Sequence, residues 1–123
     1  MIVIKSLINL TYLDLTNNGI CDEDIKILME NLKENKNLKT LILNKNNITS
    51  SSGFYIADTL SKKTTLEEIY LRYNKVNENG LNSLINILLY KNKSIITLDL
   101  SYNIIYNKKI LFQLVIFYHQ IQI

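Results

Sequence analysis

The side chains that most often carry out catalysis are few in this chain of 123 residues. Cys21 and His119 are the single cysteine and the single histidine, and together they could form a nucleophile and its base. Asp14 and Asp99 could act as a paired acid and base only if the two carboxyls were neighbours. No Cys or His spacing is typical of a metal site, and the three glycines are too scattered to cradle a phosphate.

A sequence repeat decides whether these side chains can meet. A pattern of the form Leu-x-x-Leu-x-Leu-x-x-Asn-x-Ile begins at Leu10, Leu38, Leu66 and Ile95, so the steps are 28, 28 and 29 residues (10 to 38, 38 to 66, 66 to 95). Four matches in register over one short chain indicate units that stack into a solenoid. Each unit then contacts only the units on either side of it.

Each pattern contains alternating apolar residues, such as Leu13 and Leu15, which predict a β-strand with its leucines on one face. Because the units are nearly equal in length, the strands are expected to stack in parallel at roughly 5 Å per step. Three repeats separate Cys21 from His119, and the same holds for Asp14 and Asp99, so neither pair reaches hydrogen-bonding distance. We therefore predict no enzymatic activity, no cofactor and no metal site.

A helical stretch follows each of the first three patterns. Apolar residues recur there at the spacing of one helix face: Ile25, Leu28, Met29 and Leu32; Phe54, Ile56, Ala57 and Leu60; Leu81, Leu84, Ile85 and Leu88. Residues 22–24, 50–52 and 77–79 offer capping side chains or negative charge at the helix starts. The long period agrees with a full α-helix in each repeat.

The asparagine of the pattern recurs at the same phase in all four repeats: Asn18, Asn46, Asn74 and Asn103. It follows the strand at a tight turn. Its amide can both donate to and accept from backbone groups that the bend leaves unpaired. We predict that these asparagines form a structural ladder.

The phrases at residues 18–28 and 74–84 resemble the ribonuclease-inhibitor-like class of leucine-rich repeats, with its repeats of this length. The resemblance covers about Ile4 to Phe117. It implies an α/β leucine-rich-repeat solenoid, a right-handed β-α superhelix with parallel strands on the concave face and α-helices on the convex face. The class includes ribonuclease inhibitor, Ran GTPase-activating proteins, tropomodulin-type actin-binding proteins and the sensor regions of innate immune receptors, and it implies a protein-binding scaffold.

The chain departs from this class at some positions. Gly53 and Gly80 match the small residue that often opens the helix, whereas repeats one and four have Asp24 and Lys108 there. No catalytic residue of the activators in the class carries over to this chain.

On the concave face, residues between and after the strand leucines are expected to point toward a partner. The predicted partner-binding residues are Tyr12, Asp14, Ile42, Lys45, Glu68, Tyr70, Arg72, Tyr73, Asp99 and Tyr102. Because Tyr and Arg are enriched among interface hot spots, Tyr70, Arg72, Tyr73 and Tyr102 form the predicted anchor cluster. The alternative is that these tyrosines only form strands and reflect a bias toward A/T-rich codons.

These observations predict a protein-protein interaction scaffold that binds a protein partner through the concave strand face. Two alternatives stay open. One is a regulator of a partner enzyme, with a role like that of a small-GTPase activator. The other is a fragment of a longer leucine-rich-repeat receptor or scaffold.

We predict a single domain over residues 1–123, with repeats at about 7–34, 35–62, 63–91 and 92–118. Residues 1–6 match the last turn of a preceding helix, and residues 119–123 form a tail. Residues 110–118 are apolar on nearly every side, as in a helix that needs to be covered. Both ends therefore resemble cut surfaces, which indicates truncation or a divergent tail, or self-association through the uncapped ends.

Composition narrows the partner and the location. The net charge of +3 is small and its Lys and Arg are spread over predicted helices and turns, so no nucleic-acid binding is expected. Cys21 is expected to be partly buried and has no internal disulfide partner. With no leader and no apolar stretch near the roughly 20 residues of a membrane span, a cytoplasmic location is predicted. Glycosylation triplets begin at Asn9, Asn47 and Asn92 and matter only in a secreted protein.

Overall fold

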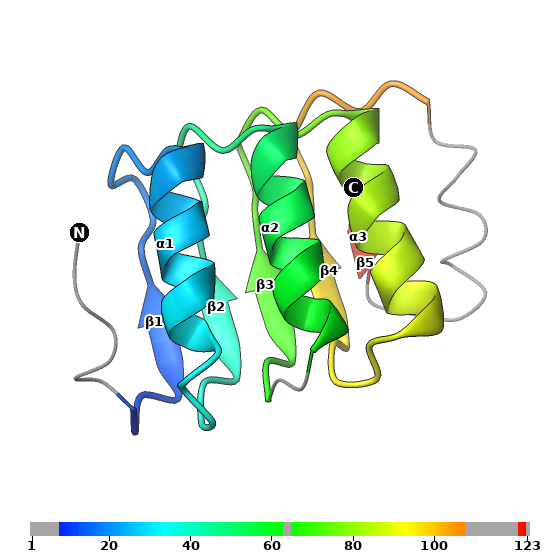
Figure 1. Ribbon diagram of the computed structural model, residues 1–123. Coiled ribbons are helices and arrows are strands. Elements are labelled where there is room, and N and C mark those ends of the chain that lie inside the picture. Colours follow the sequence, from blue (N-terminus) through cyan, green and yellow to red (C-terminus); the bar gives the residue numbers. More distant parts are fainter. Residues whose placement is uncertain (1–7, 63–64, 108–120, 123) are drawn as a thin grey trace.

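The chain alternates short strands with α-helices (Figure 1). The computed structural model describes residues 8–62, 65–107 and 121–122. The strands are β1 (Tyr12–Asp14), β2 (Thr40–Ile42), β3 (Glu68–Tyr70), β4 (Thr97–Asp99) and β5 (Ile121–Gln122). The helices are α1 (Asp22–Leu32), α2 (Ser50–Ser61) and α3 (Glu78–Tyr90).

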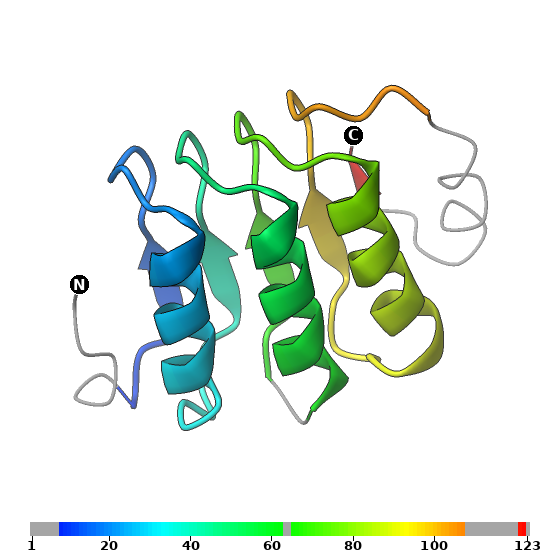
Figure 2. The same ribbon diagram turned by 45° about the horizontal axis from the view of Figure 1, so that its top comes forward.

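The strands form one parallel sheet in the order β1-β2-β3-β4-β5. Equivalent leucine positions are in register: Leu13 pairs with Leu41, Leu41 with Ile69, and Ile69 with Leu98. The helices all lie on one side of the sheet, as Figures 1 and 2 show. The predicted α/β solenoid is therefore confirmed. The repeat pattern did not predict β5, which lies within the expected tail 119–123. This strand pairs with β4 and extends the sheet.

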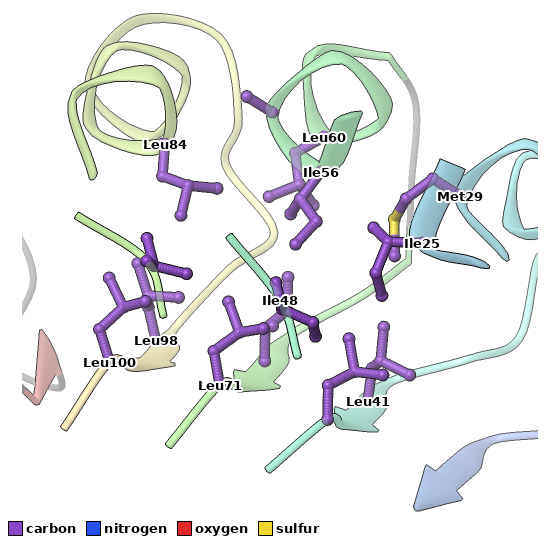
Figure 3. Packing of buried hydrophobic residues seen from close by; sticks show 14 of the residues in the cluster. Ile25, Met29, Leu41, Ile48, Ile56, Leu60, Leu71, Leu84, Leu98 and Leu100 are labelled. Atoms are coloured by element: carbon purple, nitrogen blue, oxygen red, sulfur yellow. The ribbon is translucent and has the colours of Figure 1, made fainter. Parts of the chain in front are cut away.

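The core lies between the sheet and the helices, where alternation and helical periodicity bring two apolar faces together. Leucines of the strands and turns face apolar side chains of the helices (Figure 3). The members that Figure 3 labels are Leu41, Ile48, Leu71, Leu98 and Leu100 on the strand side, and Ile25, Met29, Ile56, Leu60 and Leu84 on the helix side. Because Leu41 and Leu71 are fully buried while the residues on either side of each are only half-buried, the other face of the sheet is open.

The three helices begin at different N-cap residues, and the Thr49 side chain makes no cap hydrogen bond at the start of α2. The Asn77 side chain accepts a hydrogen bond from the backbone N–H of Asn79 at 2.9 Å, as expected for an N-cap. The caps of α1 and α2 are Cys21 and Thr49, one residue before the segments that the sequence indicated. Cys21 is exposed, so the expectation of partial burial is wrong: the N-cap position places its thiol at the surface, where it donates to Asp24 Oδ2.

Helices α2 and α3 approach closely because each begins with a glycine-containing turn. A Cβ atom on Gly53 would lie 2.8 Å from Gly80 Cα and 2.9 Å from the Gly80 carbonyl oxygen. A Cβ on Gly80 would lie 2.9 Å from a methyl group of Val76 and 3.0 Å from Ser50 Cα. The two glycines therefore set the spacing of these helices. Counted from the pattern asparagine, Gly80 is equivalent to Asp24 of α1, and Gly53 is equivalent to Ile25.

Several expectations lie outside the described residues. They concern the remnant helix at residues 1–6, the apolar segment 110–118, Lys108 and His119. Within the described ranges, no helix has the length and apolar content needed to cross a membrane. The same ranges contain no group of Cys, His, Asp or Glu side chains placed to hold a metal ion.

Candidate protein-binding face

The pattern asparagines hold the turns at the end of each strand. Asn74 Oδ1 accepts from the backbone N–H groups of Asn46 and Ile48, both at 3.1 Å. Its Nδ2 donates to the carbonyls of Leu43 and Leu71 at 2.9 and 3.1 Å. One buried side chain thus joins the turn of its own repeat to the turn of the preceding one, which gives the residues beside it a rigid base.

The same bonds recur at Asn46, which bridges to Asn18, Ile20 and Leu15 of the first repeat. They recur at Asn103, whose Oδ1 accepts from Val76 N–H at 2.9 Å. Asn18 differs, because its side chain is exposed and, among the described residues, donates to the Thr16 carbonyl of its own turn alone. The bridging side chains therefore belong to the second, third and fourth repeats.

The residue before each ladder asparagine has a left-handed backbone. Asn17, Lys45, Tyr73 and Tyr102 have φ angles of 57°, 55°, 56° and 61°. The backbone N–H groups of Lys45 and Tyr73 donate to Arg72 and Ser101 of the next repeat, so the sheet's hydrogen bonding continues through the turn. The turn thus places one side chain per repeat in a row along the edge where the strands end.

Two of these side chains form an exposed aromatic stack. The rings of Tyr73 and Tyr102 lie 4.3 Å apart with an interplanar angle of 3°. Their exposed fractions are 46% and 64%. Lys45 Nζ lies 5.7 Å from the Tyr73 ring centre, and Arg72 Cζ lies 5.7 and 5.6 Å from the two rings, distances within the range of cation–π attraction. We call Lys45, Arg72, Tyr73 and Tyr102 the aromatic rim cluster.

Asp99 lies under this cluster and is almost fully buried. Its Oδ2 is 3.7 Å from Arg72 Nε, an ion pair that is longer than a hydrogen bond. Its Oδ1 accepts from the Ser101 backbone N–H and hydroxyl at 2.9 and 2.5 Å. The Asn44 amide oxygen accepts from the Arg72 backbone N–H at 2.8 Å. The Arg72 backbone is therefore held on both sides, since its carbonyl also accepts from the Lys45 N–H, while the guanidinium Nε is buried at 3.7 Å from the Asp99 carboxylate.

Tyr70 is engaged in a separate interaction on the open face. Its hydroxyl donates to Glu68 Oε2 at 2.6 Å, and Thr40 Oγ1 donates to Glu68 Oε1 at 3.3 Å. This hydrogen bond to Glu68, together with burial, raises the pKa of Tyr70 to about 12. Tyr70 is half-buried and neutral, so it supports the face from within rather than projecting like Tyr73.

The N-terminal half of the open face has a different character. Tyr12 is 54% exposed, and Asp14 and Ile42 lie in one row with Tyr70 and Asp99. Hydrogen bonds from the Thr16 hydroxyl and backbone N–H hold the pKa of Asp14 below its usual value. This half therefore presents a carboxylate and isolated side chains.

The structure brings Lys45, Arg72, Tyr73 and Tyr102 together and separates Tyr12 from them. The sequence grouped Tyr70 with the anchors and did not include Lys45 among them. Two supporting residues, Asn44 and Ser101, were expected only to face outward. The sequence signal for their supporting role was a short polar side chain directly after a strand.

A polar network between helix starts was also missed. The Asp22 carboxylate accepts from the Thr49 backbone N–H at 2.9 Å and from the hydroxyls of Thr49 and Ser52. In the next repeat, the Ser50 hydroxyl contacts Asn77 Oδ1. A Ser, Thr, Asn or Asp in each helix start was the sequence signal for these bridges.

Comparisons with known proteins agree with this architecture. A model of the family described as Leucine Rich repeat matches residues 6–29 and 34–57. No curated protein matches the chain in sequence. Among solved structures, Leiomodin-1 Actin-Binding Site 2 is similar with a TM-score of 0.81 at 19% identity, over 91% of this chain and 69% of that one. The repeats stack into a parallel sheet that is covered by helices on one side, so the fold is an α/β solenoid of leucine-rich repeats.

Proposed function

We propose that this protein is an interaction scaffold that binds a protein partner through the open, concave face of its sheet. The aromatic rim cluster is the centre of the binding surface, and Tyr12, Asp14, Ile42, Glu68, Tyr70 and Asp99 extend it across the face. The observation that carries the proposal is the exposed stack of Tyr73 and Tyr102 between two cations. Large planar side chains with polar ends supply most of the binding energy in many interfaces.

The backbone at these tyrosines supports the proposal. A left-handed conformation costs an ordinary L-residue about 1–2 kcal/mol, and asparagine and glycine adopt it most readily. Asn17 occupies this position in the first repeat, but Tyr73 and Tyr102 occupy it in the third and fourth. A bulky aromatic residue at a left-handed position lowers the stability of the fold. Because the side chain is about half exposed, packing in the core does not require it there. Contact with a partner is the role that accounts for it.

The wider class supports protein binding as well. A full helix in each of the first three repeats agrees with the ribonuclease-inhibitor-like class, to which we assign the chain. The name of Leiomodin-1 Actin-Binding Site 2 states that this similar structure binds actin, a protein. At 19% identity the likeness concerns the fold, so it supports the kind of function and not the partner.

A cytoplasmic location is part of the proposal. The exposed Cys21 thiol suits a reducing compartment, where free surface cysteines persist. The triplet at Asn92 is unsuited to glycosylation in the folded protein, because Asn92 is buried and its Nδ2 donates to the Leu60 carbonyl at 2.9 Å.

A quantitative pull-down from source lysate tests the proposal with two matched variants. Tyr73→Asn/Tyr102→Asn removes the aromatic stack and leaves residues that suit the left-handed backbone. Tyr90→Asn/Tyr106→Asn removes two more exposed tyrosines, 76% and 85% exposed, outside the cluster. We expect a specific partner to be lost with the first variant and retained with the second.

The same capture discriminates between the functional classes. A small GTPase whose hydrolysis rises when this protein is added would identify a regulator. Identical partners for wild type and Tyr73→Asn/Tyr102→Asn would show that binding does not use the open face.

A further inference from the structure

We infer that the aromatic rim cluster binds an acidic segment of the partner, an extended stretch in which a carboxylate and an aromatic or apolar side chain lie two residues apart. The inference rests on the proposed function and adds the chemistry of the partner. It follows from the charge of the cluster, the free surface of its rings and the charges that surround it.

The cluster carries surplus positive charge. Among the described residues, Lys45 forms no ion pair, and its ammonium group lies over the Tyr73 ring at 5.7 Å from the ring centre. Arg72 pairs with Asp99, but that carboxylate is only 11% exposed and its other oxygen is held by Ser101. Solvent therefore meets two cations and little of the balancing acid. A carboxylate on a partner would form charge-assisted contacts there.

The rings offer an apolar surface beside these cations. Tyr73 and Tyr102 cover one face of each other, and about half of each residue stays exposed. A side chain two residues away from a carboxylate bound at Lys45 or Arg72 would point the same way and could lie over the ring surfaces. In an extended segment, residues i and i+2 lie on the same side, so an acidic and an aromatic residue two positions apart match the cations and the stack.

The surrounding charges favour a protein segment over a nucleic acid. Aromatic stacks next to cations also bind single-stranded nucleic acid when bases can insert between or lie over the rings. Here the two rings already lie 4.3 Å apart, which leaves no slot for a base between them. Asp14 and Glu68 on the open face would repel a phosphate backbone that continued across the sheet, whereas a peptide can place neutral residues there.

The test measures binding of fluorescent peptides to the full chain. The probe is a peptide of about 8 residues with the repeat Glu-Ser-Tyr-Ser, which places Glu and Tyr on the same side, spans roughly 26 Å when extended and can cross the strands of the cluster. Matched peptides replace Glu by Gln or by Lys, and a single-stranded oligothymidylate serves as the nucleic-acid probe. We expect the Glu peptide to bind about tenfold more tightly than the Gln peptide, with a preference that falls as salt rises.

Two double variants localise the effect. Lys45→Gln/Arg72→Gln is expected to abolish the preference for the Glu peptide. Lys36→Gln/Lys93→Gln removes the same charge from exposed loops between helices and strands and is expected to retain it. Circular dichroism of each variant checks that it is folded.

Several outcomes would overturn the inference: no binding of the Glu peptide, equal affinity for the Glu and Gln peptides, a preference for oligothymidylate, or an unchanged preference in Lys45→Gln/Arg72→Gln. Its failure is distinguishable from failure of the proposed function. If Glu and Gln peptides bind equally and both are lost with Tyr73→Asn/Tyr102→Asn, the open face binds proteins but does not select acidic ones.

Discussion

Two adjacent rows of residues run along the edge where the strands end, and they have opposite properties. One row contains Asn46, Asn74 and Asn103, which are the same residue in every repeat and bridge neighbouring turns. The row one residue earlier contains Lys45, Tyr73 and Tyr102, which vary from repeat to repeat and face solvent. The two rows share a turn but have different partners.

The difference shows what makes a repeat position uniform. A buried amide must satisfy several backbone groups at fixed distances, and asparagine has the donors, the acceptor and the length for this. A side chain that projects into solvent meets no such demand, even where its backbone is left-handed. Uniformity therefore marks the scaffold of this protein, and variation marks the surface available for binding.

The largest expected effect tests the uniform row. Asn74→Ala should lower the free energy of unfolding by about 3 kcal/mol or more, because buried backbone groups of two repeats lose their partners. Urea unfolding followed by circular dichroism measures the change. Asn18→Ala is the control and should cost less than about 1 kcal/mol, since that side chain is exposed and bonds only within its own turn. Equal losses for the two variants would refute the role of bridging.

The second prediction tests whether the close packing of α2 against α3 requires glycine at position 53. Gly53→Ala should lower the free energy of unfolding by about 2 kcal/mol, because the new methyl would overlap the Gly80 backbone at 2.8 Å. Ser51→Ala in the same helix is exposed and should change it by about 0.5 kcal/mol or less. A stabilised Gly53→Ala protein, as helix propensity alone predicts, would show that the two helices can move apart.

The third prediction concerns the hydrogen bonds from Thr49 and Ser52 to the Asp22 carboxylate, which join the first two repeats. Burial raises the pKa of Asp22, but hydrogen bonds from Ser52 and Thr49 outweigh it and hold the pKa below the usual 3.8. A depressed pKa contributes stability above the unfolded-state value, and this stability is lost as the pH falls through the folded-state value. Stability should therefore fall on acidification below about pH 4, and less steeply in Asp22→Asn. Identical acid profiles for the two proteins would show that the bridge does not depend on the charge.

The smallest expected effect tests the variable row. Tyr73→Asn/Tyr102→Asn should change the free energy of unfolding by less than about 1 kcal/mol, because relief of the left-handed backbone offsets the lost ring stacking. Tyr73→Val/Tyr102→Val should be less stable than the Asn variant, since branched residues suit a left-handed backbone poorly. Denaturant unfolding of the two variants gives the comparison. If the Asn variant loses several kcal/mol, the stack belongs to the scaffold and not to a binding surface.

Much of the fold was predictable because it depends on local periodicity. Alternation at Leu41 and Leu43 predicts a strand with one buried face, and the spacing of Ile25, Leu28 and Leu32 predicts a helix with one. Repetition of both at nearly constant length requires parallel strands in register. The predicted partial burial of Cys21 was wrong, because its exposure depends on its N-cap position. The spacing of apolar residues does not reveal this geometry.

The candidate site was predictable only as a list of outward-facing residues. The sequence by itself determined the repeat, the side of the sheet that stays open and the residues that line it, because these follow from spacing along the chain. Only the tertiary structure decided that Tyr73 and Tyr102 stack, that Lys45 and Arg72 lie beside them and that Tyr70 is held by Glu68. The stacked rings, and the contacts of Lys45 with Tyr73 and of Arg72 with Tyr102, join residues of different repeats, and their distances are set by the turn's backbone angles and by the stacking of the strands. Tyr70 and Glu68 lie in the same strand, where alternate residues share the open face.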